Sequence, residues 1–114
     1  MEEIGIMKLL GFRETSRFTS RVVELLDDED YAKLQLYLAE FPDAGSLIKG
    51  GGGIRKLRYA LPGRGKSGGA RIIYFWAVEN GLILMLEIYA KNEQGDLSDD
   101  QVNALRKEVK GINP

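Results

Sequence analysis

Hydrophobic and polar positions follow two different periods along this chain, and the periods predict seven elements. Three stretches have apolar residues every three or four positions, which is typical of helices, and four shorter apolar runs are typical of strands. The predicted elements are a strand over Lys8–Glu14, helices ending at Leu26 and spanning Glu29–Glu40, strands over Ile54–Leu61, Ala70–Val78 and Leu82–Tyr89, and a helix from Leu97 to about Lys110. This order, β-α-α-β-β-β-α, predicts a small α+β protein whose antiparallel sheet is covered by helices on one side.

Polar residues mark the predicted ends of the helices. Thr15 or Ser16 can cap the first helix and Ser98 the last, because a hydroxyl there accepts an unpaired backbone N–H. Pro42 ends the second helix, and Asn80-Gly81 predicts a tight hairpin turn with positive φ angles. The side chains expected on the buried sides of the helices are Phe18, Val22, Val23, Leu25, Leu26, Tyr31, Leu34, Leu38, Phe41, Val102, Leu105 and Val109.

The length of 114 residues leaves room for one core, so we expect a single domain over 1–114, with residues 1–7 as a frayed start. The apolar run Gly81–Ala90 is too short to cross a bilayer and is interrupted by Glu87. No charged-then-apolar leader is evident at the start. These features predict a cytoplasmic protein with no membrane partner.

The chain has no Cys and no His, and this restricts its chemistry. Disulfides, thiolate nucleophiles, imidazole acid–base catalysis and most zinc sites are excluded, so we predict no metal site and no cofactor. Any catalysis must come from Lys, Arg, Tyr, Ser, Asn or carboxylates.

The segment Gly50–Trp76 concentrates positive charge in a chain of formal net charge −1. No acid occurs between Asp43 and Glu79. The cationic residues of the segment are Arg55, Lys56, Arg58, Arg64, Lys66 and Arg71. Cations on adjacent strands attract phosphate, which we favour over a merely solubilising basic strand pair. The four glycines before Ile54 are not followed by Gly-Lys-Ser/Thr and a helix, so a P-loop is not predicted.

Strand periodicity places these cations relative to one another. Lys56 and Arg58 should share one face of their strand, and Arg55 should lie on the other face with Leu57 and Tyr59. Arg64 and Lys66 fall in the Gly- and Pro-rich loop, from which they could close over a polyanion. Arg71 and Lys91 lie at the entry and exit of the predicted hairpin, so they should be near the same end of the sheet.

Three ordered motifs resemble the HigB branch of the RelE/ParE toxin superfamily. They are Gly-Gly-Ile-Arg-Lys-Leu-Arg from Gly52, Gly-Lys-Ser-Gly-Gly-Ala-Arg-Ile-Ile-Tyr from Gly65, and Ile-Tyr-Ala-Lys-Asn-Glu-Gln-Gly-Asp-Leu-Ser from Ile88. The Phe-Pro-Asp-Ala-Gly ending of the second helix also fits, and the similarity spans roughly Phe12 to Lys110. The resemblance implies a RelE-like fold and a toxin of a type II toxin–antitoxin pair. It also implies a metal-independent endoribonuclease that cuts mRNA in the ribosomal A site and so inhibits translation.

The resemblance also implies roles for particular residues. Lys56 matches an acid–base and phosphate-orienting lysine, and Arg71 matches the arginine that holds the scissile phosphate. Lys91 falls where such enzymes place further cations, but Asn92 stands where RelE has an arginine. The tyrosine that RelE has near its last helix is missing, and Tyr89 is a displaced substitute. The implied partners are ribosome, mRNA and a cognate antitoxin, of the HigA-like helix-turn-helix kind, through which alone operator DNA is bound.

The residue inventory is consistent with RNA cleavage by its own 2′-hydroxyl. Fixed cations can stabilise the charge that develops on the phosphate, and a lysine held among other cations can act as a base near neutral pH. Lys56 is the first candidate for this base and Lys91 the second, so the predicted catalytic residues are Lys56, Arg71 and Lys91. Lys56 could instead be a plain phosphate contact, Arg71 a structural ion-pair partner, and Tyr59, Tyr74 and Tyr89 core residues rather than base-stacking ones. A ParE-type gyrase poison and a non-catalytic nucleic-acid or ribosome-binding module are the alternative functions.

Overall fold

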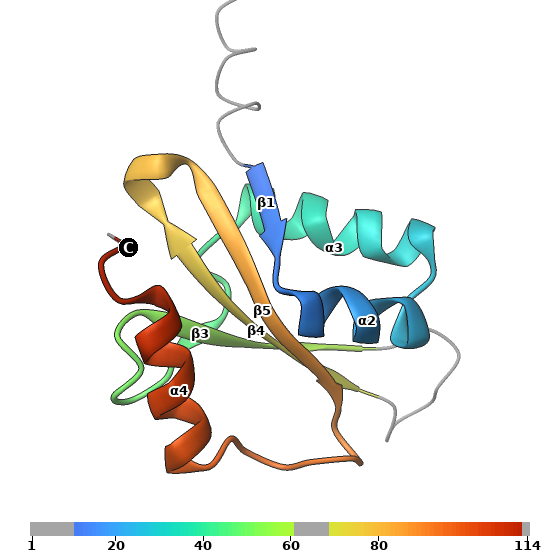
Figure 1. Ribbon diagram of the computed structural model, residues 1–114. Coiled ribbons are helices and arrows are strands. Elements are labelled where there is room, and N and C mark those ends of the chain that lie inside the picture. The colour runs from blue at the N-terminus through green and yellow to red at the C-terminus, as the bar shows by residue number, and fades with distance from the viewer. Residues whose placement is uncertain (1–10, 61–68, 113–114) are drawn as a thin grey trace, which may run out of the picture.

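The computed structural model describes residues 11–60 and 69–112, which form a mixed α+β structure (Figure 1). The elements are β1 (Gly11–Glu14), α2 (Ser16–Leu25), α3 (Asp28–Glu40), β2 (Ser46–Leu47), β3 (Ile54–Tyr59), β4 (Ala70–Ala77), the 3-10 helix η1 (Val78–Asn80), β5 (Leu82–Ala90) and α4 (Asp99–Val109). The predicted order is confirmed, and the two-residue strand β2 is the strand that the pattern missed. The predicted frayed start over residues 1–7 lies outside the described residues.

The five strands form one sheet in the order β1-β5-β4-β3-β2. Strands β3, β4 and β5 pair antiparallel, as predicted, and β2 adds to β3 in the same way, whereas β1 runs parallel to β5. The two strands are far apart in the sequence, since α2, α3 and strands β2 to β4 lie between β1 and β5. Parallel neighbours need such a long connection, whereas a short turn can join only antiparallel ones. A β-bulge between β4 and β5 at Ile73/Tyr74 interrupts the register in the middle of the hairpin.

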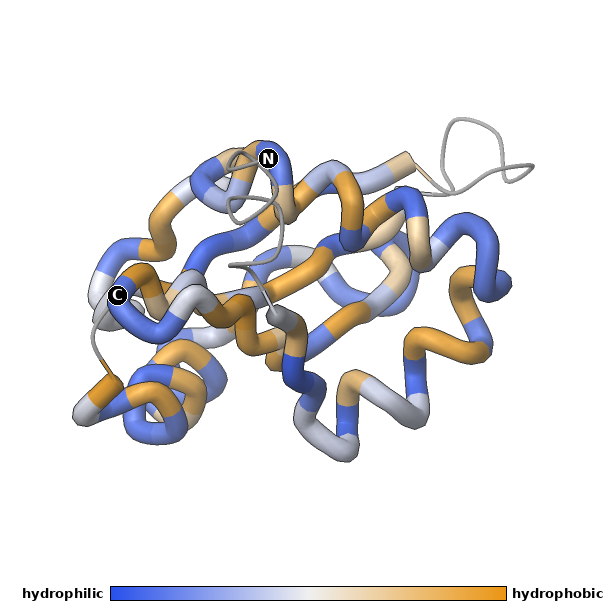
Figure 2. The backbone as a smooth tube through the Cα atoms, turned by 90° about the horizontal axis from the view of Figure 1, so that it is seen from above, coloured by the Kyte–Doolittle hydropathy of each residue, from blue (hydrophilic) through white to orange (hydrophobic). Residues whose placement is uncertain are grey.

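Helices cover both faces of the sheet, so the prediction of one-sided coverage was wrong. One core lies between the sheet and helices α2 and α3, and includes Phe18, Leu34 and Tyr74. The other lies between the sheet and α4, and includes Phe75 and Leu105. The reason is visible in β4, whose nearly continuous apolar run buries both of its faces, as strands covered on two sides do. Figure 2 shows the hydrophobic segments running through the middle of the molecule.

Side-chain caps begin the three α-helices. Thr15 accepts a hydrogen bond from the N–H of Phe18, and Asp27 accepts one from Asp30 at the start of α3. Ser98 caps α4 in a reciprocal capping box with Gln101, which confirms the predicted cap. Each cap satisfies backbone donors that a helix leaves unpaired, so these residues set where the helices begin.

The turn between β4 and β5 differs from the predicted Asn-Gly hairpin. The chain makes the 3-10 turn η1, and Gly81 follows it with φ of 60°. Asn80 does not take a positive φ, since every positive-φ residue in the described part of the chain is a glycine. The longer turn leaves Val78 half-exposed at its tip.

Two predicted core residues lie at the surface. Val23 is 71% exposed because it lies on the outer side of α2, while Phe18 and Val22 of that helix are buried. Phe41 is 46% exposed because it follows the last residue of α3 and no longer shares the face of Leu34 and Leu38. None of the helices in the described ranges is long and apolar enough to cross a membrane.

Candidate functional site

Two arginines face each other on the sheet surface that also carries α4. Arg58 of β3 is the register partner of Arg71 of β4, and Arg71 is in turn the partner of Tyr89 of β5. Lys56 lies two positions from Arg58 and pairs with Ile73, so its side chain is on the same face. We call Lys56, Arg58 and Arg71 the cation row. Like charges directly opposite on neighbouring strands destabilise a sheet. The pairing of Arg58 with Arg71 therefore suggests that an anion binds between the two guanidinium groups.

The two arginines have no acidic partner within the described ranges, since the ion pairs there involve other cations. Among the described residues, the Arg71 guanidinium makes one long hydrogen bond, from Nη1 to the carbonyl of Ala70 at 3.3 Å. A planar guanidinium can bind two phosphate oxygens at once, and it stays charged at any physiological pH. The arrangement is thus suited to holding a phosphodiester.

Lys56 does have an acidic partner, which the sequence did not predict. Its Nζ donates a hydrogen bond to Oδ1 of Asp96 at 2.8 Å. Hydrogen bonding and charge from Lys56 lower the pKa of Asp96, and the charges of Arg58 and Arg71 lower it further. Asp96 therefore lies within electrostatic reach of the whole cation row. The sequence did not predict this partner, because the segment between Asp43 and Glu79 contains no acid. Asp96 lies forty residues after Lys56, and the loop before α4 brings it to the site.

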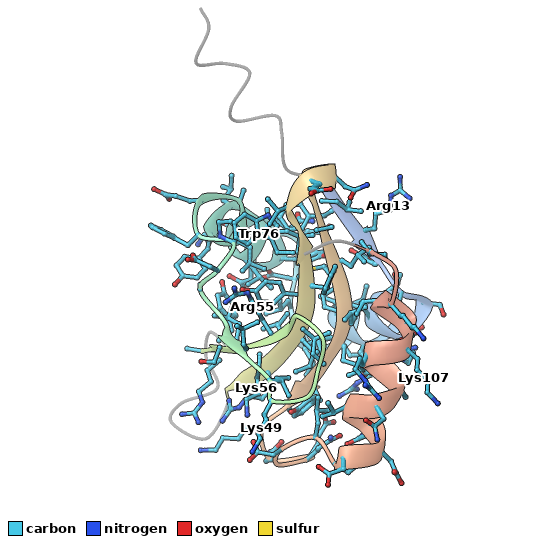
Figure 3. All side chains as sticks on the ribbon, turned by 90° about the vertical axis from the view of Figure 1, so that its left-hand side faces the viewer. Arg13, Lys49, Arg55, Lys56, Trp76 and Lys107 are labelled. Carbon is cyan, nitrogen blue, oxygen red and sulfur yellow. The ribbon has the colours of Figure 1, made fainter. Side chains whose placement is uncertain are left out.

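A groove of about 660 Å³ opens beside Lys56, between β2 and β3 on one side and the start of α4 on the other. Its volume is within the range of small-ligand sites. It is lined by Ala44, Ser46, Leu47, Ile48, Lys49, Lys56, Leu57, Arg58, Asp96, Leu97, Asp99 and Val102. Figure 3 shows Lys49 and Lys56 near each other at the lower part of this face, whereas Arg13 and Lys107 lie on the other side of the molecule. Sequence reasoning missed Lys49, Asp96 and Asp99, since only the fold brings them to β3.

Lys91 and Asn92 follow the end of β5, near the start of β4. The N–H of Lys91 donates to the carbonyl of Gly69 at 2.8 Å, two residues before Arg71. The predicted proximity of the backbone at Arg71 and Lys91 is confirmed. Both Lys91 and Asn92 are exposed, and their roles toward RNA stay predictions.

Arg55 is separated from the cation row. It lies on the opposite face of β3, as the strand period predicted, and its Nη1 donates to the carbonyls of Asp43 (3.2 Å) and Gly45 (2.8 Å). Arg55 thus holds the connector after α3 against the sheet, which is a structural role. Arg64 and Lys66, also predicted to bind phosphate, lie outside the described residues.

The three tyrosines of the predicted site differ in their surroundings. Tyr74 is fully buried and belongs to the core, as expected, and Tyr59 packs at the edge of the same core. Tyr89 is only 6% exposed, and its hydroxyl has no hydrogen-bond partner in the part of the chain that the structure describes. Burial raises the pKa of Tyr89, and the charge of Arg71 opposes that shift. An unpaired buried hydroxyl is unfavourable, so the Tyr89 O–H is available to donate a hydrogen bond to a group that enters the site.

Most of the charged side chains described at the site are cationic. Over the described ranges, no group of three or more Asp or Glu side chains is placed to hold a metal ion. The ammonium and guanidinium groups present here bind anions by charge and hydrogen bonding. The chemistry that these groups favour is phosphate binding with stabilisation of added negative charge.

The family comparison matches the part of the chain that forms this site. The model of the family described as the RelE toxin of the RelE/RelB toxin–antitoxin system matches residues 42–113. The matched region is more than half of the chain and contains β2 to β5, α4, the cation row and Asp96. The chain belongs to the RelE toxin family of RelE/RelB toxin–antitoxin systems.

Proposed function

We propose that this toxin is an endoribonuclease that cuts mRNA in the A site of the ribosome and so inhibits translation. The observation that carries the proposal is the unpaired facing of Arg58 and Arg71 beside Lys56 on one open face of the sheet. We further propose that the whole chain acts as one toxin domain in the cytoplasm, where ribosomes and mRNA are found.

The reaction is attack of a 2′-hydroxyl on the adjacent phosphate, followed by loss of the 5′-oxygen. The transition state carries more negative charge on the phosphate oxygens than the substrate does. Arg71, with Arg58 opposite it, is placed to bind those oxygens and to stabilise that charge. Losing one such donor typically costs about 10²–10³-fold in rate, or roughly 3–4 kcal/mol.

Proton transfer requires other groups, because arginine keeps its proton. Lys56 is the amine of the cation row. In its neutral form, after its ammonium has released one proton to solvent, it is the candidate to accept the proton of the 2′-hydroxyl. Lys91 and Tyr89 are the candidates to protonate the leaving oxygen. Lys91 is exposed near the end of β5, and the Tyr89 hydroxyl has no partner among the described residues.

Substrate and partner follow from the same surface. Arg58 and Asn92 are both exposed, and we propose that they contact the RNA backbone next to the phosphate bound by Arg71. As a RelE-family toxin, the chain pairs with an antitoxin. We propose a HigA-like helix-turn-helix antitoxin, which would bring the complex to operator DNA.

The test is cleavage of mRNA on programmed ribosomes, mapped by primer extension, with Arg71→Ala and Arg71→Lys compared to the wild type. We expect cuts within the A-site codon that require the ribosome, a loss of at least about 10²-fold in Arg71→Ala, and partial activity in Arg71→Lys. The matched control is Arg13→Ala, an exposed arginine of β1 away from the site, which should cut normally.

Other outcomes would change the assignment. Translation arrest with intact mRNA would contradict cleavage and would favour a ribosome-binding module. Normal translation together with inhibited gyrase would favour a ParE-like poison. Equal activity of Arg71→Ala and Arg13→Ala would exclude the cation row as the catalytic site.

A further inference from the structure

An acidic side chain lies against the cations of the proposed phosphate site. The Asp96 carboxylate accepts a hydrogen bond from Lys56, and Lys56 is its only side-chain partner in the ranges that the structure describes. A carboxylate carries the same sign of charge as a phosphodiester and offers the same kind of acceptor oxygen. Its contact with Lys56 therefore has the chemistry expected of a bound RNA phosphate.

The carboxylate is held lightly. The Asp96 side chain is 87% exposed, whereas that of Lys56 is 22% exposed. Exposed ion pairs contribute little to stability, so the contact can break without disturbing the fold. Asp96 lies in the connection between β5 and α4, two residues before the cap Ser98, and a Cβ added at the neighbouring Gly95 would meet no other atom within 4 Å. The packing at Gly95 therefore does not oppose a shift of the carboxylate away from Lys56.

We propose that the Asp96 carboxylate occupies the phosphate position of the cation row in the free toxin and that RNA phosphate displaces it on binding. This inference rests on the proposed function of the site as an RNA-binding one. Asp96 is then an internal competitor that weakens binding of anions in general. RNA that reaches Arg58 and Arg71 as well as Lys56 replaces one weak contact by several charge-assisted ones.

A purely structural role for Asp96 makes a different prediction. If Asp96 only positioned the Lys56 ammonium, an amide oxygen at the same place would preserve the hydrogen bond. Asp96→Asn would then bind RNA as the wild type does, and Asp96→Ala would bind more weakly. Competition predicts instead that both substitutions strengthen binding, because both remove the negative charge.

The experiment measures binding of a short 2′-O-methyl oligoribonucleotide, which cannot be cleaved, by fluorescence anisotropy at constant ionic strength. The variants are Asp96→Asn, Asp96→Ala and the control Asp100→Asn. Asp100 is an exposed acid in the first turn of α4, so its substitution changes the net charge equally. We expect about 3–10-fold tighter binding for both Asp96 variants and less than about twofold for Asp100→Asn. Unchanged or weaker binding by Asp96→Asn would overturn the proposal, as would an equal gain in Asp100→Asn.

A second measurement uses the wild-type protein and so does not depend on how the variants fold. The Asp96 carboxyl carbon is followed by NMR titration with and without saturating oligonucleotide. Displacement from Lys56 should raise the pKa of Asp96, and a pKa that stays the same would contradict it. Both measurements are independent of cleavage. If Asp96→Asn binds more tightly but neither the wild type nor a variant cuts mRNA, the nuclease proposal is contradicted and this inference stands. If mRNA is cut but Asp96→Asn does not bind more tightly, this inference is contradicted and the nuclease proposal stands.

Discussion

At the residue scale, the site depends on side chains that the sheet holds in an unfavourable arrangement without a ligand. Arg58 faces Arg71, and the hydroxyl of Tyr89 is buried without a partner among the described residues. Both features lower the stability of the free protein. On the proposed function, a bound phosphate would relieve both, and local violations of this kind are expected at functional sites.

Tyr89→Phe tests whether the tyrosine hydroxyl serves the reaction. Removing an unpaired buried hydroxyl should leave the free energy of unfolding unchanged or raise it by roughly 1 kcal/mol. If the hydroxyl donates a proton or a hydrogen bond to the phosphate, mRNA cleavage should fall at least about tenfold. Urea unfolding and the primer-extension assay measure the two effects. A variant that is less stable and fully active would show that the hydroxyl has a structural partner instead.

At the element scale, Tyr74 joins Arg55 in attaching the connector after α3 to the sheet. The Tyr74 hydroxyl accepts from the N–H of Gly45 and donates to the carbonyl of Pro42, both at 2.8 Å. Gly45 cannot be larger, because an added Cβ would lie 2.9 Å from the carbonyl oxygen of Lys56. This close approach brings β2 alongside β3 and forms one wall of the groove.

Tyr74→Phe should therefore destabilise the protein more than its small change in volume suggests. Two backbone groups would lose their buried partner, which costs about 1–3 kcal/mol. Urea unfolding gives the value, with Tyr59→Phe as the control. The Tyr59 hydroxyl makes no hydrogen bond to a described residue, so its loss should cost less than about 0.5 kcal/mol. Equal effects in the two variants would mean that the Tyr74 contacts do not secure the connector.

At the scale of the whole molecule, the distribution of charge is more informative than its sum. The formal net charge is −1, yet Lys56, Arg58 and Arg71 share one face. Much of the acid is used elsewhere, as where Arg17 of α2 binds both Glu87 of β5 and Glu108 of α4. These pairs connect both helix layers to the sheet and leave the cation row available.

Binding of RNA should accordingly depend on salt through the cation row and not through the net charge. Each phosphate contact with single-stranded RNA contributes a slope of about −0.7 to log K against log salt concentration. Arg58→Ala and Arg71→Ala should each reduce the magnitude of the slope by about 0.7–1, measured by anisotropy with the 2′-O-methyl oligonucleotide. Arg13→Ala should leave the slope as it is. An equal change of the slope in all three variants would indicate that RNA responds to the overall charge of the protein and not to the cation row.

Much of the candidate site could be predicted because strand periodicity is local. The separation of Lys56 and Arg58 from Arg55 follows from the alternation of side chains in β3, and the proximity of Arg71 and Lys91 follows from the hairpin. The direct pairing of Arg58 with Arg71 could not be predicted, since the register of β3 against β4 depends on how the two strands are connected and packed and not on either strand alone. The contact of Asp96 with Lys56 could not be predicted either, because it joins segments forty residues apart.

The sequence by itself determined the types and order of the three α-helices and of β1, β3, β4 and β5, the capping regions of α2 and α4, and the cations that share a strand face, because each depends on neighbours within a few residues. The tertiary structure alone decided that both faces of the sheet are covered, that β1 lies parallel to β5, and that Asp96 reaches the cation row. Those outcomes depend on how distant segments pack to bury apolar surface. That packing is a property of the whole chain and not of any stretch within it.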